Sequence, residues 1–453
     1  MRSQRRRGLR SQDATRAPAA HRLVLLMGPA FVAGVAYLDP GNVASNMTAG
    51  AQYGYLLVWV VVLGNLMAWL IQYLSAKLGI VTGRSLPDVL GRRIRHRWSR
   101  RAYWAQAELV AMATDLAEVI GGAVALNLLF GIPLVWGGLI TGAVSIVLLI
   151  LQSRRGPRPF EFVIVGLLAI IAVGFTAGVV VAPPDITSAL SGLEPRFADT
   201  NSVLLATSIL GATIMPHAIY AHSSLSRDRF VSQRRDQDGG FSTWTARGAA
   251  GSRREIEHTE PLPGTSTSIP ANVLLRATRW DVSAAMVIAG AVNLCIMLLA
   301  AATLPGVAGT DSLEGAHAAL GVALGPMIAT LFAVGLLASG LASTAVGAYA
   351  GAEIMSGLLH IRVPLVLRRI VTLAPAIAIL WLGFDPTQSL VLSQVVLSFG
   401  IPFALIPLVA LTANSALLGP WRNHWLTTAA GIVASVLLIA LNGVLLWLVF
   451  AGV

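Results

Sequence analysis

The sequence has little charge, almost no lysine and almost no cysteine. Of its 453 residues only 12% are charged, and it contains one lysine and one cysteine, Cys295. A single cysteine excludes an internal disulfide and a cysteine metal cluster. No Walker A motif is present, so an ATP-driven motor is not indicated, and the absence of His-Glu-x-x-His argues against an intramembrane metalloprotease. Any work that the protein performs would therefore have to come from a gradient.

Hydrophobic runs make up most of the chain, since 55% of its residues are hydrophobic. A membrane-spanning helix needs about 20 consecutive apolar residues. We therefore predict an all-α membrane protein with eleven transmembrane helices. The predicted spans are 23–50, 54–78, 102–130, 134–152, 160–182, 202–225, 281–304, 318–358, 364–383, 387–416 and 425–450.

The charges are sorted between the two sides of the predicted membrane. The net charge is +11, almost all from arginine, and Arg196 is the only basic residue on the side opposite the N-terminus. The positive-inside rule therefore makes the N-terminal side cytoplasmic and the C-terminal end external, in the cell (inner) membrane. The excess of arginine is explained by membrane topology, so no nucleic-acid partner is expected. The basic tail 1–22 and the polar connection 226–280 are predicted to be cytoplasmic, the second as a mobile linker.

The first predicted span is interrupted at its centre by Asp39-Pro40-Gly41-Asn42. A carboxylate at bilayer depth costs about 2.5–3.5 kcal/mol on insertion scales. Pro40 removes a backbone donor, and Gly41 adds backbone freedom. In lipid, a broken helix is tolerated only where the exposed backbone lines a cavity or is buried by protein. The pattern predicts a helix unwound beside Asp39, with a proline kink and a hydrogen-bonded aspartic acid as the alternative.

The sixth predicted span has a similar interruption, at Gly211–His217, where Met215 directly precedes Pro216. Two interrupted segments in corresponding positions of two halves are typical of a transporter's binding site. Spans one and six correspond if the chain contains two inverted five-helix repeats. We therefore predict repeats over 23–182 and 202–416, followed by an eleventh helix at 425–450.

The two interruptions offer a coherent set of ligands for a cation. Asp39 and Asn42 are three residues apart, and so are Ala212 and Met215. Residues three apart share a helix face. The predicted site combines the Asp39 carboxylate, the Asn42 amide, the Met215 thioether and the carbonyls of Ala36 and Ala212. A soft sulfur favours later transition metals over Mg²⁺ and Ca²⁺, which prefer oxygen alone.

Further polar residues lie in the third, sixth and tenth spans. The third span carries three carboxylates, which are costly in a membrane unless they have a function or partners. Histidine titrates near neutrality, so acidic and histidine residues in series suggest a proton path. Buried packing, or a solvated helix end in the case of Glu108, is the alternative. The residues are Glu108, Asp115, Glu118, His217 and His222, with Gln394 as a further oxygen ligand or a hydrogen-bonding residue.

These motifs resemble the Nramp family of proton-coupled divalent-metal transporters. The first-span match is Asp39-Pro40-Gly41-Asn42, and the sixth-span match is Met215-Pro216-His217. The third, eighth and tenth spans add matches at 115–121, 337–340 and 394–407. The resemblance covers nearly everything from position 23 to about 418.

The resemblance implies a fold like that of the amino-acid/sodium symporters, with alternating access between two inverted repeats. It implies a transporter rather than an enzyme, without a cofactor, that imports Mn²⁺, Fe²⁺ or a similar ion together with protons. Carried over by motif, the metal ligands are Asp39, Asn42, Met215, Ala36 and Ala212. Asp39, Asp115 and Glu118 become proton-handling groups that lead towards Arg368 and Arg369, with Glu108, His217 and His222 as further members.

Two positions depart from the family pattern. Leu341 and Gly400 stand where the family commonly has glutamine. If the tenth-span glutamine is a ligand in some conformations, Gln394 is the possible substitute in this chain.

Two other functions remain open from the residues. A symporter of an amino acid or another organic cation would share the broken-helix architecture, but an amino acid would need donors for its carboxylate. A membrane-embedded metallohydrolase would need an activated water and a general base, for which a thioether ligand is poorly suited.

Overall fold

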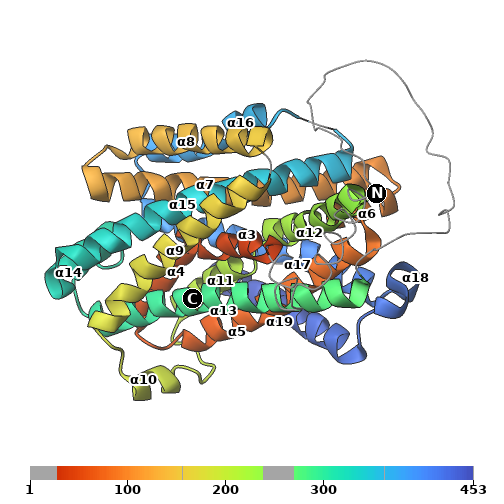
Figure 1. The fold of residues 1–453 in the computed structure, drawn as a ribbon. Helices are drawn as coiled ribbons and strands as arrows, with labels where there is room; N and C mark the ends of the chain where they lie inside the picture. The colour runs from red at the N-terminus through yellow and green to blue at the C-terminus, as the bar shows by residue number, and fades with distance from the viewer. Residues whose placement is uncertain (1–27, 156, 238–269, 362, 452–453) are drawn as a thin grey trace, which may run out of the picture.

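The computed structural model describes residues 28–155, 157–237, 270–361 and 363–451. The predicted tail 1–22 and most of the predicted linker 226–280 lie outside these residues. Helices and short connections form the whole of the described part, and it contains no strand. The helices, shown in Figure 1, are α3 (Pro29–Val35), η1 (Ala36–Leu38), α4 (Pro40–Tyr53), α5 (Val58–Thr82), α6 (Leu86–Arg93), α7 (Arg97–Phe130), α8 (Leu134–Arg155), α9 (Pro157–Val181), α10 (Ile186–Ser191), α11 (Thr200–Thr213), α12 (Pro216–Gln237), α13 (Ala271–Thr303), α14 (Leu313–Leu324), α15 (Pro326–Leu359), α16 (Leu365–Leu382), α17 (Pro386–Ala413), α18 (Ser415–Leu418), η2 (Gly419–Trp421) and α19 (Trp425–Ala451).

Helices occupy the described part of all eleven predicted spans, which confirms the predicted fold class. Eight stretches of the described chain are long and apolar enough to cross a membrane as they stand. The other three predicted spans hold interrupted or shorter helices, namely α3–η1–α4, α8 and α16.

Two predicted boundaries were wrong. The eighth span, predicted as one segment over 318–358, is divided at Gly325, whose φ of 95° is unfavourable for other residues, and Pro326 starts α15. The linker predicted over 226–280 is shorter at both ends, because α12 runs on to Gln237 and α13 already begins at Ala271. Polar residues at a helix end can remain helical outside the hydrocarbon, so composition alone places such a boundary poorly.

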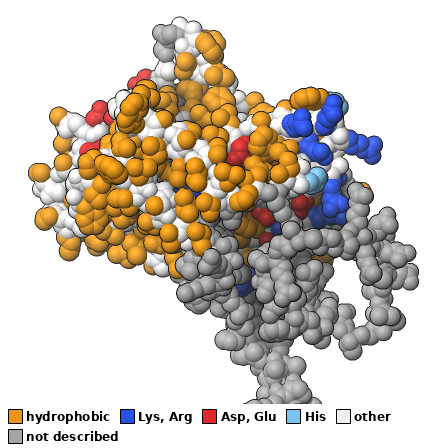
Figure 2. All heavy atoms as spheres, turned by 90° about the horizontal axis from the view of Figure 1, so that it is seen from above, with side chains coloured by type: hydrophobic (Ala, Val, Ile, Leu, Met, Phe, Trp, Pro, Cys, Tyr) orange, Lys and Arg blue, Asp and Glu red, His pale blue; other side chains and the backbone are white. Residues whose placement is uncertain are grey.

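The interrupted helices lie at the centre of the bundle and the most apolar ones lie at its edge. In the apolar stretch of α11 and α12 94% of the residues are buried, compared with 28% in α19 and 33% in α9. Figure 2 shows that hydrophobic side chains cover most of the described surface on the face in view. A lipid-facing surface is expected to look like this, whereas polar groups within the span belong in the interior.

The first interruption begins with the short 3-10 helix η1. Asp39 then adopts an extended conformation (φ −72°, ψ 165°), and Pro40 is the first residue of α4. Proline suits this first position, because it has no N–H to leave unpaired. The prediction of a helix unwound beside Asp39 is confirmed.

The second interruption lies between α11 and α12. Ile214 leaves the helical conformation (φ −116°, ψ 64°), and Pro216 starts the next helix. Both broken helices therefore restart at a proline, with Asp39 or Met215 directly before it.

Helix α17 packs tightly against both interruptions through two glycines. A Cβ atom on Gly211 would lie 1.9 Å from the backbone oxygen of Gln394, and one on Gly41 would lie 1.7 Å from its side-chain nitrogen. Only glycine permits so close an approach of backbones. The two glycines therefore bring the Gln394 side chain to the break in the first helix.

Candidate functional site

Asp39 is fully buried, and both of its carboxylate oxygens accept hydrogen bonds. Oδ1 accepts from the backbone N–H of Asn42 at 2.7 Å and from Asn42 Nδ2 at 3.1 Å. Oδ2 accepts from Gln394 Nε2 at 3.2 Å. Asp39 thus caps α4 while it faces α17, so local helix geometry and tertiary packing fix the same carboxylate.

The Asn42 amide joins the two interruptions directly. Its Nδ2 donates to Asp39 Oδ1 and also to the carbonyl oxygen of Ala212 at 2.8 Å. The oxygens of Asp39 and Ala212, which the sequence predicts to share one site, therefore lie on either side of one amide nitrogen. This contact brings together residues 170 positions apart in the chain.

Two buried amide oxygens at this place have no hydrogen-bond partner among the described residues. They are Asn42 Oδ1 and Gln394 Oε1. A buried polar atom is normally satisfied, so each such exception calls for an explanation. Both belong to predicted ligands, and an amide oxygen is a suitable donor for a divalent cation.

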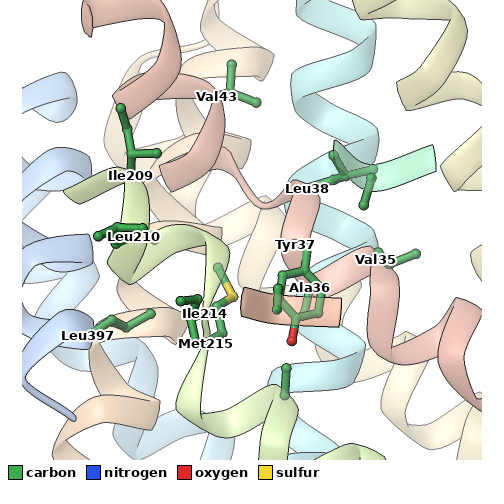
Figure 3. Close-up of a cluster of buried hydrophobic side chains, with 14 of the residues drawn as sticks. Val35, Ala36, Tyr37, Leu38, Val43, Ile209, Leu210, Ile214, Met215 and Leu397 are labelled. Atoms are coloured by element: carbon green, nitrogen blue, oxygen red, sulfur yellow. The ribbon is translucent and has the colours of Figure 1, made fainter. Parts of the chain in front are cut away.

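The Met215 side chain is buried between the two broken helices. In Figure 3 it extends from the break between α11 and α12 towards Ala36 and Tyr37 of η1. Neighbouring carbonyls of the first break are already paired: Asn293 Nδ2 donates to Tyr37 O at 2.9 Å, and Ser339 Oγ donates to Leu38 O. Neither of these hydrogen bonds uses the carbonyl of Ala36, the other predicted carbonyl donor.

The third-span carboxylates form ion pairs with two arginines of α16. Arg369 Nη1 pairs with Asp115 Oδ1 and lies 3.6 Å from Glu118 Oε2. One turn of α7 separates these two carboxylates, so a single guanidinium faces both. Arg369 Nε also donates to Ser145 Oγ at 2.9 Å, which fixes the guanidinium from a third helix.

Glu108 pairs with Arg368, whose Nη2 lies 2.9 Å from Oε1. The Glu108 side chain is only 12% exposed, so it is not simply a solvated helix end. Both arginines lie inside the bundle and not in the connection that follows the eighth span. They lie at the start of α16 and are 5% and 1% exposed, because buried carboxylates of α7 attract them into the bundle.

The two histidines of α12 face different helices. His217 Nδ1 lies 3.1 Å from Thr114 Oγ1 on α7. His222 Nδ1 is hydrogen-bonded to Gln72 Oε1 on α5, and Gln72 Nε2 reaches the Tyr37 hydroxyl beside the first break. The described residues contain no group of three or more His, Cys, Asp or Glu side chains that could hold a metal.

Sequence reasoning missed three polar residues that touch this site. Gln72, Asn293 and Ser339 reach Tyr37 or Leu38 from α5, α13 and α15. Each is a buried polar side chain in an apolar span, which is a signal of interhelical hydrogen bonding. That signal names no partner, so it could not link them to the first break.

The departure at Gly400 has a packing explanation. A Cβ atom at this position would lie 2.4 Å from Val110 Cγ2 on α7. A glutamine could therefore enter only if the Val110 side chain turned away or α7 and α17 moved apart. Gln394, two turns earlier, instead donates to Asp39, whereas nothing in the structure explains Leu341.

Comparisons with known proteins agree with this arrangement. A model of the Nramp family, described as natural resistance-associated macrophage protein-like, matches residues 30–448. A relative from Mycobacterium tuberculosis named divalent metal cation transporter MntH is 56% identical over 427 residues, which cover 94% of this chain and 92% of the relative.

Solved structures show the same fold. The manganese transporter of Eremococcus coleocola is 31% identical, with a TM-score of 0.75, and the match covers 93% of this chain and 85% of that one. MHP1, a nucleobase-cation-symport-1 family transporter, is 12% identical with a TM-score of 0.52, a likeness of fold alone. With the family model matched almost from end to end, and with a relative more than half identical over nearly its whole length, this chain belongs to the Nramp family.

Proposed function

We propose that the protein imports divalent transition-metal ions such as Mn²⁺ and Fe²⁺ across the cell membrane, coupled to protons and by alternating access. The observation that carries this proposal is the bridge from Asp39 through the Asn42 amide to the Ala212 carbonyl. It brings a carboxylate and a carbonyl from two broken helices to one point inside the bundle. The names of the relatives, a divalent metal cation transporter and a manganese transporter, agree with it.

The proposed ligands are Asp39, Asn42, Met215, Ala36, Ala212 and Gln394. Asp39 supplies the negative charge that a buried cation needs. The unpaired oxygens of Asn42 and Gln394 supply neutral donors, and a turn of the Asn42 amide would present Oδ1 in place of Nδ2. Met215 provides the soft donor that separates transition metals from Mg²⁺ and Ca²⁺.

The proposed proton-handling groups are Asp39, Asp115 and Glu118, leading to Arg369 and, through Glu108, to Arg368. The charge balance at Arg369 supports this role, since one guanidinium faces the two carboxylates of Asp115 and Glu118. One guanidinium balances only one of the two carboxylates. The second carboxylate can bind a proton and later release it. His217 and His222 extend the same set of polar groups, from α12 towards α7 and α5.

The proposed orientation places the N-terminus in the cytoplasm and the C-terminal end outside. The proposed repeats, 23–182 and 202–416, each begin with one broken helix, α3–η1–α4 in the first and α11–α12 in the second. Movement of one repeat against the other would expose the site to one side at a time.

Uptake of Mn²⁺ into proteoliposomes under an inward proton gradient tests the function. We expect Asp39→Asn to abolish uptake and to weaken Mn²⁺ binding in calorimetry by at least tenfold, because the site loses its charge. Asp311→Asn is the matched control, since it makes the same chemical change at an exposed position. Uptake that survives in Asp39→Asn would refute the proposed site, and hydrolysis without ion flux would refute the transporter.

A further inference from the structure

The cytoplasmic end of the bundle, in the proposed orientation, carries a dense group of arginines outside the transport site. We call it the arginine patch, and it spans α6 and the first turn of α7. Its members are Arg84, Arg92, Arg93, Arg95, Arg97, Arg100 and Arg101, and all but the half-buried Arg100 are exposed. Figure 2 shows Lys and Arg side chains gathered at one end of the molecule, next to the hydrophobic surface.

No carboxylate among the described residues neutralises the patch. Asp88 is the only acidic residue between positions 84 and 101, and it pairs with Arg227 of α12 at 2.8 Å. No ion pair joins a patch arginine to a carboxylate anywhere in the part of the chain that the structure describes. A partner for the patch must therefore be an anion from outside the described protein.

The length of α7 places the patch outside the hydrocarbon core of the bilayer. The helix has 34 residues, which corresponds to about 51 Å at 1.5 Å per residue. The hydrocarbon core is about 30 Å thick, and about 40–45 Å when the headgroup regions are included. Because α7 is longer than the hydrocarbon core is thick, its first turn at Arg97–Arg101 lies outside the core, at or beyond the headgroups, when its apolar end is in the hydrocarbon.

Trp98 distinguishes this patch from a cluster of arginines that is simply exposed to solvent. Its side chain is 58% exposed, and the guanidinium carbons of Arg97 and Arg101 lie 5.7 Å and 5.1 Å from its ring centroid. Tryptophan is enriched at membrane interfaces, where its ring sits at the headgroup level. A guanidinium held against an aromatic face keeps N–H groups available for bidentate contact with a phosphate.

We propose that the arginine patch is a binding surface for anionic phospholipids of the adjacent leaflet. The guanidinium groups of Arg95, Arg97 and Arg101 contact the headgroup phosphates, and Trp98 lies at the border between the headgroups and the acyl chains. Juxtamembrane basic clusters attract anionic lipids in this way, and each arginine near the surface contributes about fivefold in affinity. The surface is separate from the proposed metal and proton sites, so its test does not depend on transport.

Native mass spectrometry of the purified full chain can count the lipids that it retains. The probes are phosphatidylglycerol and phosphatidylcholine with identical acyl chains, titrated at low and high salt. We expect Arg95→Gln/Arg97→Gln/Arg101→Gln to lower the affinity for phosphatidylglycerol by about 100-fold at low salt and to leave that for phosphatidylcholine unchanged. Screening should reduce the difference at high salt.

Arg196→Gln is the matched control, because it removes an exposed arginine from the opposite side of the molecule. Trp98→Ala is a second variant, which we expect to weaken phosphatidylglycerol binding severalfold without any change in charge. An unchanged melting temperature shows that the variants are folded. A loss of less than tenfold in the triple variant, or an equal loss in Arg196→Gln, overturns the proposal; a surface built for an acidic protein would give the first result.

Discussion

At the scale of single residues, the proposed site depends on two kinds of buried polar atom. Some have no hydrogen-bond partner, and one nitrogen donates to two acceptors. Asn42 Nδ2 serves two acceptors, while Asn42 Oδ1 and Gln394 Oε1 have none among the described residues. An unpaired acceptor in a low-dielectric interior is costly, and a bound cation would remove that cost. The donor set is therefore defined as much by unused lone pairs as by charge.

Met215→Ala tests the role of the thioether. Removal of the sulfur leaves an all-oxygen donor set, which favours hard cations. We expect uptake of Mn²⁺ to fall severalfold and discrimination against Ca²⁺ and Mg²⁺ to weaken by at least tenfold, measured by competition in proteoliposomes. Met327→Ala, at an exposed position, is the control. An equal loss for all ions in Met215→Ala would contradict the selectivity argument.

Asp199 gives a pH-dependent test outside the membrane-spanning helices. The hydrogen bonds from the Tyr53 hydroxyl at 2.6 Å and the backbone N–H of Ser202 at 2.7 Å hold the pKa of Asp199 below its ordinary value. A depressed pKa stabilises the fold above the unfolded pKa of about 3.9, and this stabilisation is lost as the pH falls through the folded pKa. Asp199→Asn should therefore lower the melting temperature at pH 7, with a difference that shrinks below about pH 4. A difference that stays constant from pH 7 to pH 3 would contradict this account.

At the scale of helices, α17 determines how closely the two broken segments approach each other. Gly211 of α11 lies against the backbone of Gln394, whereas Gly41 of α4 lies against its flexible side chain. A side chain can rotate away from an added methyl group, but a backbone oxygen inside a helix cannot. The contact at Gly211 is therefore the less tolerant of the two.

Gly211→Ala is expected to destabilise the protein by about 1–3 kcal/mol, the usual cost of an overpacked core. Thermal unfolding in detergent measures the effect, and Mn²⁺ uptake should fall because α11 carries Ala212. Gly166→Ala on α9 is the matched control, since no atom lies within 4 Å of the added Cβ. Equal melting temperatures for Gly211→Ala and the unchanged protein would show that the helices can separate at no cost.

The sequence predicts the broken helices well because proline and a buried carboxylate act locally. Asp39 and Pro40 interrupt their own helix wherever it packs, and the same holds for Pro216. Which side chains pair between helices depends on tertiary packing, which a local sequence pattern does not specify. The contacts of Gln72 and Asn293 with Tyr37, and the burial of Arg368 and Arg369 within the bundle, therefore needed the structure.

At the scale of the whole molecule, polarity increases from the edge towards the centre. The α19 and α9 helices expose apolar side chains, while the broken α11–α12 segment is almost fully enclosed. Arginine is also distributed unequally between the two ends of the bundle. The arginine patch at 84–101 lies at the end that we propose to be cytoplasmic, and Arg196 lies in a connection at the other end.

Labelling with a membrane-impermeant maleimide tests this orientation in intact cells. In a Cys295→Ala background, Ser191→Cys should react from outside, and Ser99→Cys should react only after permeabilisation. Both positions are exposed, so access depends on the side of the membrane. The reverse pattern would invert the proposed topology.

The Asn42 bridge has a consequence for a carrier that must return unloaded. An ionised carboxylate without a partner in the membrane interior would raise the free energy of the empty carrier, because no group there replaces its water of hydration. In this structure an amide N–H group lies between the oxygens of Asp39 and Ala212, at the position that we propose for the cation. In the proposed transporter, this amide would substitute for the cation in the empty site, and the return step would not require a second ion.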